Sequence, residues 1–418
     1  MTAFSAATVT PIFAQDDIAA KQALYKKYTD NYAGTLDQKQ VAIDAAKEYI
    51  QKYGANADDK DQVDYFQKNL PALETAVRKA QEGAKFGNTV KRFDTSFPAG
   101  NYDETYASGR ELLAKNPELL DVLIVLGSIG YDESLKTPPN TKYNADTINY
   151  AKMAIQKIES GTTSKNYGAF GIYTYGDYPR SETNKNDKFP GKDNALGNLN
   201  FKIAYLTYLN PGTKKDAIPY FYKASKYDSS VKNLPLIYQA IGDSYFEQAK
   251  QLNKQGEDLA KAAGDKDTEE SIAKNSLAKG YADRAIDAYA RAYKLASTNQ
   301  AVKKEYKDGL YKLLQELFKF RYNGKTDSLD TFVASVMSKP MPDPTTTVSP
   351  VVEATPATTT TGASMSSVSN TTVDDAPAAS SGSPSKTSAT GAAKTSTTAA
   401  PAAKAPVKKP APKKKGTR

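Results

Sequence analysis

The sequence predicts an all-α fold in which helices follow one another along most of the chain. Large apolar and aromatic residues recur at helical spacing, as in Tyr25, Tyr28 and Tyr32 at positions i, i+3 and i+7. Glycines and prolines punctuate these stretches, and no series of alternating apolar and polar residues of strand length is present. The pattern extends from Gln15 to about Ser338, where we expect the folded domain.

The stretch DQKQVAIDAAKEYIQKY, which begins at Asp37, predicts one of the first helices. It lies between Gly34 and Gly54, and glycine commonly ends helices. One side of this helix carries Val41, Ala45, Tyr49 and Lys52.

A short motif of small and aromatic residues occurs twice in the second half of the domain. The stretches AIPYFYKASKY and AIDAYARAYKL both place Ala-Ile first, an aromatic residue four positions after the Ala, and another Ala three positions later. The offset from Ala217 to Ala285 is 68 residues, which is twice 34. This spacing indicates a repeat of one structural unit. The residues concerned are Ala217, Phe221 and Ala224, then Ala285, Tyr289 and Ala292.

Residues 198–231 fit one helix–turn–helix unit of 34 residues, with Asn-Pro-Gly as the turn. This unit resembles the tetratricopeptide repeat, in which small residues let two helices approach closely and an aromatic residue fills the space against the next pair. Tyr205 departs from the family pattern, which prefers Gly at that position. The matching positions are Tyr208, Gly212, Ala217, Phe221 and Ala224.

Other stretches between about residues 98 and 297 fit the same pattern, whereas residues 15–97 fit it weakly. The resemblance implies an irregular, tetratricopeptide-like α-solenoid of about five to six helical hairpins. A bundle of ordinary amphipathic helices is the alternative. The further matching residues are Gly100, Tyr102 and Pro117, then Leu123, Leu126 and Gly127, then Tyr238, Ile241, Gly242 and Tyr245.

Two places interrupt the regular spacing. No proline lies between Tyr245 and Ala285, so we expect two long helices of one hairpin that meet near residues 264–267; a degenerate whole repeat is the alternative. The stretch GIYTYGDYP at 171–179 alternates briefly between glycines and is compatible with a short β-hairpin.

Composition divides the chain into three parts. Residues 3–14 are mostly apolar or small, which resembles the end of a secretory signal cleaved after Ala14, and this favours export to the periplasm or beyond. The pattern lacks a positive first region, so a loose N-terminus of a cytoplasmic protein is the alternative. Residues 15–338 form the helical domain. Residues 339–418 are rich in Ala, Pro, Thr, Ser and Lys, with few large apolar side chains, and we expect them to be disordered.

The positive charge of the chain belongs to its tail. The chain has 56 Lys and Arg and 47 Asp and Glu residues, and nine basic residues but no acidic residue follow Asp375. Residues 1–375 therefore carry 47 charges of each sign, which gives no support to a nucleic-acid-binding body. A flexible cationic tail could instead bind anionic envelope polymers, lipid headgroups or nucleic acid; a solvated extension without a partner is the alternative.

The absence of His and Cys excludes the commonest catalytic and metal-binding chemistry. Histidine acid–base catalysis, cysteine nucleophiles, disulfides and the usual zinc sites are impossible. The carboxylate clusters at 58–64 and 264–270 lack the spacing of a calcium loop and are better explained as helix caps and N-terminal charges. No cofactor or metal is expected, and a hydrolase that relies on Asp and Glu is the least favoured alternative.

The first hypothesis for function is a non-enzymatic scaffold that binds proteins or peptides. In tetratricopeptide arrays the first helices line a curved groove, and the resemblance implies groove positions in three of them, although these could also be solvated surface. A tyrosine-rich insertion at 166–194 is a further candidate binding loop, unless it folds back and caps the array. The second hypothesis is an adaptor whose tail binds a polyanion. The candidate residues are Asp121, Ile124, Ser128, Lys202, Gln239 and Asp243 in the groove, and Tyr173, Tyr175 and Tyr178 in the insertion.

Overall fold

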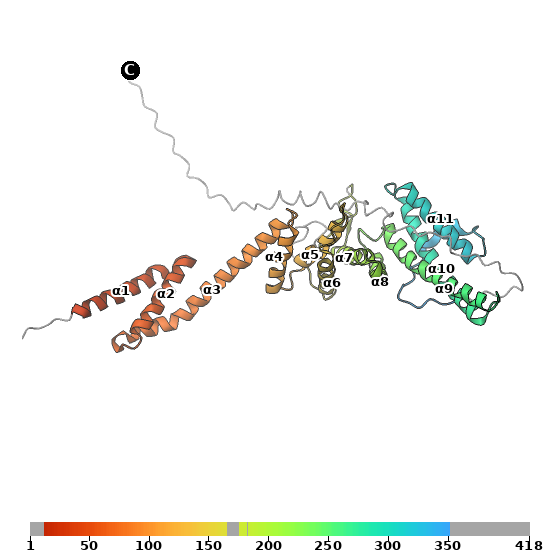
Figure 1. Ribbon diagram of the computed structural model, residues 1–418. Coiled ribbons are helices and arrows are strands. Elements are labelled where there is room, and N and C mark those ends of the chain that lie inside the picture. Colours follow the sequence, from red (N-terminus) through yellow and green to blue (C-terminus); the bar gives the residue numbers. More distant parts are fainter. Residues whose placement is uncertain (1–11, 165–174, 182, 352–418) are drawn as a thin grey trace, which may run out of the picture. The chain divides into compact units, whose positions relative to one another are not determined.

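The computed structural model describes residues 12–164, 175–181 and 183–351 (Figure 1). The chain forms two compact units, which meet in the sequence between Phe97 and Pro98. Within the described ranges there are twelve α-helices, and they pack mainly against their neighbours in sequence. This arrangement confirms the all-α class and the sequential packing that the repeat pattern predicts.

Unit 1 contains three α-helices around one aromatic cluster. Thr35 and Gln38 form a capping box at the start of the second helix, since each side chain binds the backbone N–H of the other residue. The elements are α1 (Ile12–Tyr32), α2 (Leu36–Tyr53), the 3₁₀ turn η1 (Ala57–Asp59) and α3 (Lys60–Ser96).

Phe66 of α3 is the centre of the unit 1 core. Its ring lies 4.8 Å from that of Tyr28 in α1 and 5.3 Å from that of Tyr49 in α2, both measured between ring centroids. Tyr25 and Tyr32, by contrast, are 44% and 42% exposed. The shared face that the spacing of the three tyrosines suggests is therefore buried only at its middle residue.

Asp59 joins all three helices of unit 1. It accepts hydrogen bonds from the Tyr49 hydroxyl at 2.9 Å and from the Asn56 amide at 2.7 Å, and it pairs with the Lys21 ammonium at 2.6 Å. The Lys21 hydrogen bond holds the pKa of Asp59 below its usual value. The carboxylate cluster at 58–64 thus contributes a bridge between helices, in addition to the helix-terminal role expected from sequence.

Unit 2 consists of helical pairs that follow one another along the chain. Helices α5 and α6, α7 and α8, and α9 and α10 form three successive hairpins, and each hairpin also packs against the next. The elements are α4 (Tyr102–Lys115), α5 (Leu120–Ser134), α6 (Asn144–Glu159), β1 (Tyr178–Pro179), β2 (Lys188–Phe189), α7 (Gly191–Tyr208), η3 (Pro211–Thr213), α8 (Lys214–Lys226), α9 (Pro235–Ala262), α10 (Glu269–Thr298), α11 (Lys304–Arg321), α12 (Leu329–Ser335) and η4 (Val336–Ser338).

The long third hairpin confirms one of the two sequence interpretations. Helices α9 and α10 are continuous on either side of a turn at residues 263–268, so no degenerate extra repeat separates them. Gly264 and Asp265 adopt positive φ angles of 71° and 59°, which reverse the chain. Thr268 and Ser271 then cap α10 reciprocally, and Glu269 and Glu270 lie in its first turn. The carboxylates of the 264–270 cluster therefore serve the turn and the helix start.

Two helix contacts depend on glycines at the positions matched to the tetratricopeptide pattern. A Cβ at Gly127 in α5 would lie 2.8 Å from the backbone of Ala151 in α6, and one at Gly242 in α9 would lie 3.0 Å from the Tyr289 ring in α10. In both hairpins the missing side chain allows the close approach of the two helices.

The last helical element, η4, ends at Ser338, and the chain continues along unit 2 without helix after that residue. Residues 339–351 run along unit 2, and Met341 and Val348 are each only 7% exposed. Two apolar side chains of this short stretch are thus buried, although its average composition is that of the tail. Residues 352–418, and hence the expected disorder and charge of the rest of the tail, lie outside the described part of the chain.

Among the described helices, none is both long enough and apolar enough to cross a membrane.

Candidate functional site

The six groove positions expected from sequence are mostly inside unit 2, which corrects the expectation that they line an open surface. Ser128 and Gln239 are 0% exposed, and Ile124, Lys202 and Asp243 are buried as well. Asp121 alone is half-buried. The reason is that the first helices are enclosed: α7, for example, packs against α5, α6 and α8 together.

Lys202 and Ser128 form a buried polar contact between the first helices of two hairpins. The Lys202 ammonium in α7 donates to the Ser128 hydroxyl in α5 at 2.7 Å, and that hydroxyl donates to the Ile124 carbonyl at 2.7 Å. Burial disfavours the charged ammonium and lowers the pKa of Lys202 to about 8, although the nearby half-buried Asp132 opposes the shift. A hydroxyl beside an amine can in principle act as a nucleophile, but both groups are shielded from any substrate.

Replacing Lys202 by Met should stabilise the protein at pH 7. The folded-state pKa lies below that of the unfolded chain, so the buried charge costs stability below about pH 8 and the cost disappears above about pH 10.5. Methionine fits a similar volume without a charge, and we expect a gain of about 1–2 kcal/mol at pH 7. Chemical denaturation at pH 7 and pH 10.5 measures this difference.

The matched control is Lys192→Met, because Lys192 is exposed on the same helix. It should change the free energy of unfolding by less than about 0.5 kcal/mol. A loss of stability in the Lys202 variant at pH 7 would mean that the ammonium makes a net favourable interaction.

Asp243 in α9 is the centre of a second buried network. Its two carboxylate oxygens accept hydrogen bonds from Tyr208 in α7 at 2.9 Å and from Tyr289 in α10 at 2.5 Å. Burial raises the pKa of Asp243 to about 6, while the two tyrosine hydroxyls oppose the shift by stabilising the carboxylate. Asp243 therefore joins three helices of two successive hairpins through its side chain.

The raised pKa of Asp243 predicts a pH-dependent stability. Between about pH 4 and pH 6 the folded state binds a proton at this carboxyl that the unfolded chain releases. The stabilisation that arises from this bound proton is complete below about pH 4 and is lost as the pH rises through 6. Relative to Asp243→Asn, which cannot titrate, the native chain should gain about 2–3 kcal/mol between pH 7 and pH 4. Denaturation curves of both proteins across this range test the sign; a constant difference would place the pKa near its ordinary value.

The other two polar groove positions also bind neighbouring segments. The Tyr306 hydroxyl in α11 donates to the Gln239 side-chain oxygen in α9 at 2.6 Å. The Ser164 hydroxyl, in the chain after α6, donates to the Asp121 carboxylate in α5 at 2.5 Å. These contacts again connect elements of the array to one another.

The tyrosine-rich insertion is described only in part. Tyr173 lies outside the described residues, and Tyr175 and Tyr178 are half-buried. Strands β1 and β2 pair antiparallel, with Tyr178 opposite Phe189. This pairing involves only the last two residues of the stretch 171–179, and its second strand lies at 188–189, outside the stretch in which the sequence suggested a hairpin. The predicted role of the insertion in binding remains a prediction.

Arg180 fastens this hairpin to the helical array. Its guanidinium donates two hydrogen bonds to the carboxylate of Asp228, which lies between α8 and α9. One of these hydrogen bonds measures 2.9 Å. The same guanidinium lies 4.3 Å from the centre of the Phe189 ring. This part of the insertion is thus docked on the array, as the alternative interpretation expects.

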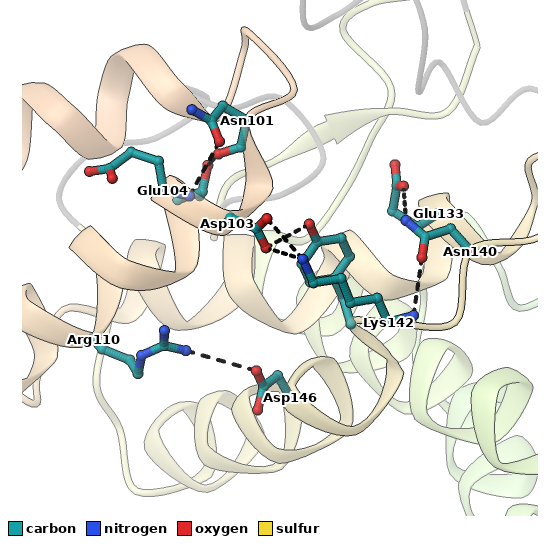
Figure 2. A network of polar contacts seen from close by, with 10 residues as sticks. Asn101, Asp103, Glu104, Arg110, Glu133, Asn140, Lys142 and Asp146 are labelled. Carbon is teal, nitrogen blue, oxygen red and sulfur yellow. Dashed lines mark hydrogen bonds and ion pairs between the residues drawn. The ribbon is translucent and has the colours of Figure 1, made fainter.

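Sequence reasoning missed a polar network around the loop between α5 and α6 (Figure 2). Asp103, in the first turn of α4, pairs with the Lys142 ammonium at 2.6 Å and accepts from the Tyr143 hydroxyl at 3.0 Å. The amide of Asn140, in the loop, donates to the Glu133 carboxylate in the last turn of α5 at 2.7 Å, and the Asn140 side-chain oxygen accepts from the Lys142 backbone N–H at 3.1 Å. Lys142 lowers the pKa of Asp103. Because Asp103 and Lys142 are far apart in sequence, local pattern could not pair them.

These arrangements connect the helices of the array to one another. The candidate polar groups in the described interior are engaged across helices, so each stabilises the packing of one element on another. Among the described residues, no group of three or more Asp or Glu side chains is placed to hold a metal ion.

Comparison of the chain with models of known protein families, with curated proteins and with solved structures finds no match.

Proposed function

We propose that the protein is a non-enzymatic scaffold whose helical pairs resemble tetratricopeptide repeats and bind other proteins. The observation that carries the proposal is the run of three hairpins in unit 2, each packed against the next in chain order. Such an array buries a continuous core while it offers a long surface to partners, which suits binding better than it suits a single catalytic pocket.

Details of the hairpins support the resemblance. Ala217, Phe221 and Ala224, the small–aromatic–small set of α8, are all fully buried. Gly127 and Gly242 lie at close contacts between the paired helices. The first-helix groove, however, is filled by Lys202, Asp243 and their partners, so we propose that partners bind on other faces of the array.

A second candidate function is that of an adaptor whose tail binds a polyanion. The observation that favours it is the set of nine Lys and Arg residues, without Asp or Glu, in residues 376–418. If the opening residues direct export, the polyanion would be an envelope polymer or an anionic lipid headgroup. The scaffold and the adaptor are compatible, because they use different parts of the chain.

Affinity capture with mass spectrometry can separate the two functions. The full chain, a chain ending at residue 375 and the Gly242→Leu variant of the full chain are used as baits under identical salt. Proteins bound by the array should be retained by the shortened chain and lost with the Gly242 variant, in which α9 and α10 are forced apart. Retention that depends only on residues 376–418 would contradict the scaffold and favour the adaptor.

A further inference from the structure

A non-helical segment of the chain, residues 339–351, lies along one face of α10, with one turn at 343–346, where the Thr346 N–H donates to the Asp343 carbonyl at 3.1 Å. The Arg291 guanidinium donates to the Lys339 carbonyl at 2.8 Å, and that of Arg284 donates to the Asp343 carbonyl at 3.4 Å. Further along, the Val351 N–H donates to the backbone carbonyl of Ser276 at 2.9 Å. As the segment advances from 339 to 351, its partners on α10 descend from 291 to 276, so the segment runs antiparallel to the helix.

Gly280 makes room for the segment in the middle of α10. A Cβ at this position would lie 2.2 Å from the Ser349 carbonyl oxygen, a distance that no side chain could tolerate. Ser276, Gly280 and Arg284 are spaced four residues apart and share one face of the helix. This face, together with Arg291, forms a track that we call the α10 groove.

The α10 groove contacts mainly the backbone of its occupant. The three hydrogen bonds named above between α10 and the segment all engage main-chain groups of the segment, and Gly280 admits a main-chain carbonyl. Side-chain selection comes from two apolar anchors, Met341 and Val348, which are buried and seven residues apart. Residues 345–347 between them are exposed. One side-chain contact supplements this, from Arg284 to the Thr346 hydroxyl at 3.3 Å.

We propose that the α10 groove is the binding site for a non-helical, proline-containing peptide of a partner protein, and that residues 339–351 occupy it in cis until such a peptide displaces them. The inference rests on the proposed scaffold function and specifies the partner: a non-helical chain with two apolar side chains seven residues apart and a turn between them. Main-chain contacts do not distinguish one peptide from another of the same backbone path, so a foreign peptide with the same anchors can replace the segment.

The covalent connection of the segment determines how tightly a partner peptide must bind to displace it. A short tethered occupant has an effective concentration of the order of millimolar, so a free partner must bind more tightly or be locally concentrated to displace it. The segment therefore lowers the apparent affinity of the groove for weak peptides. It would act as a built-in competitor that rejects chance ligands.

Displacement can be followed in the full chain with methyl-labelled methionine. The chain has five Met residues, so the NMR spectrum of their ε-methyl groups is simple; Met341 is buried and Met153 is 42% exposed. The probe is a synthetic peptide, KPMPDPTTTVSPV, which reproduces residues 339–351. At about 2 mM peptide, comparable to the effective concentration, about half of the Met341 signal should move to the position of a free methionine, while that of Met153 stays unchanged.

A second experiment frees the groove by mutation. In the full chain, Met341→Asp with Val348→Asp removes both anchors of the tethered segment and leaves α10 intact. The labelled peptide should bind this chain at least 10-fold more tightly than the native chain in fluorescence anisotropy. Adding Gly280→Val should abolish binding, since a side chain there collides with the peptide carbonyl. Gln251→Val, exposed on α9, is the matched control and should leave binding unchanged.

Two results would overturn the proposal. One is a Met341 signal that does not respond to peptide together with equal peptide affinity in native and double-variant chains, which would make the segment a permanent cover. The other is a concentration-dependent dimer whose Met341 signal does not change when peptide is added. This result would assign the groove to a second copy of the chain. If the double variant fails to fold, the NMR displacement in the native chain decides alone. Either failure leaves open capture of proteins by other faces of the array, so it is distinguishable from failure of the scaffold function.

Discussion

Gly242→Leu should lower the free energy of unfolding of unit 2 by about 3–5 kcal/mol, the largest effect that we expect from a single substitution. A Cβ at this position already meets the Tyr289 ring at 3.0 Å, and the branched remainder of a leucine overpacks the contact by about 1–3 kcal/mol. Moving the ring also breaks the 2.5 Å hydrogen bond from Tyr289 to buried Asp243, which adds about 1.5–3 kcal/mol. Thermal unfolding followed by circular dichroism should show a Tm lower by about 10 °C.

Gly212→Ala is the matched control for this prediction. Gly212 lies in the 3₁₀ turn between α7 and α8, and a Cβ there would meet only the Asn210 side-chain oxygen, at an ordinary 3.5 Å. Its φ angle is not positive, so alanine should change the Tm by less than about 2 °C. Equal or reversed effects of the two substitutions would show that the helix register matched to the tetratricopeptide pattern is wrong.

Deleting residues 376–418 should abolish retention of the protein on heparin or on anionic vesicles. The nine Lys and Arg residues are the only charged side chains of this stretch, whereas the side chains of residues 1–375 are neutral overall. Affinity that arises from counterion release should fall steeply with salt and should not depend on nucleotide sequence if nucleic acid is the probe. The elution salt from heparin and the slope of binding against salt concentration measure both properties.

Two controls make the tail experiment specific. Replacing the nine Lys and Arg residues by Gln in the full-length chain should have the same effect as the deletion, which separates charge from length. Partners of the folded array should bind the shortened chain as before. Elution of the shortened chain at the original salt concentration would contradict the charge interpretation and indicate a basic face on the folded units.

The fold was predictable from local patterns because each hairpin brings together residues that are close in sequence. Helical spacing, the glycine turns and the uninterrupted stretch between Tyr245 and Ala285 indicated the long α9–α10 hairpin, and the structure confirms it. The close-contact glycines Gly127 and Gly242 were also identifiable, since their spacing from Leu and Tyr follows the repeat pattern.

The environment of the candidate site was not predictable from the same patterns. Periodicity indicates which residues share a helix face, but it does not reveal how many other helices cover that face. Lys202 and Asp243 were therefore expected at a surface, and the structure buries them beside Ser128, Tyr208 and Tyr289. A charged residue on a face rich in tyrosines was a signal that could have indicated buried hydrogen-bonded pairs.

The α10 groove was missed for a different reason. Composition averaged over residues 339–418 conceals two apolar anchors, Met341 and Val348, within a stretch of Pro and Thr. A glycine inside a helix costs stability unless another backbone approaches it, so Gly280 was the one local indication of an occupant. The hydrogen bonds that Arg284 and Arg291 donate to the segment gave no sequence signal, because the main-chain carbonyls that accept them are about 50–60 residues away.

Hydrogen exchange of the full chain, native and Gly242→Leu, tests most directly the central claim that helical pairs are held by their sequence neighbours within two separate units. We predict that the substitution increases amide exchange in α9 and α10, and to a smaller extent in α8 and α11, which pack against them. Exchange in α1, α2 and α3 should remain unchanged, because unit 1 has its own core. Equal loss of protection in both units would contradict the claim, as would a change confined to the substituted turn of α9.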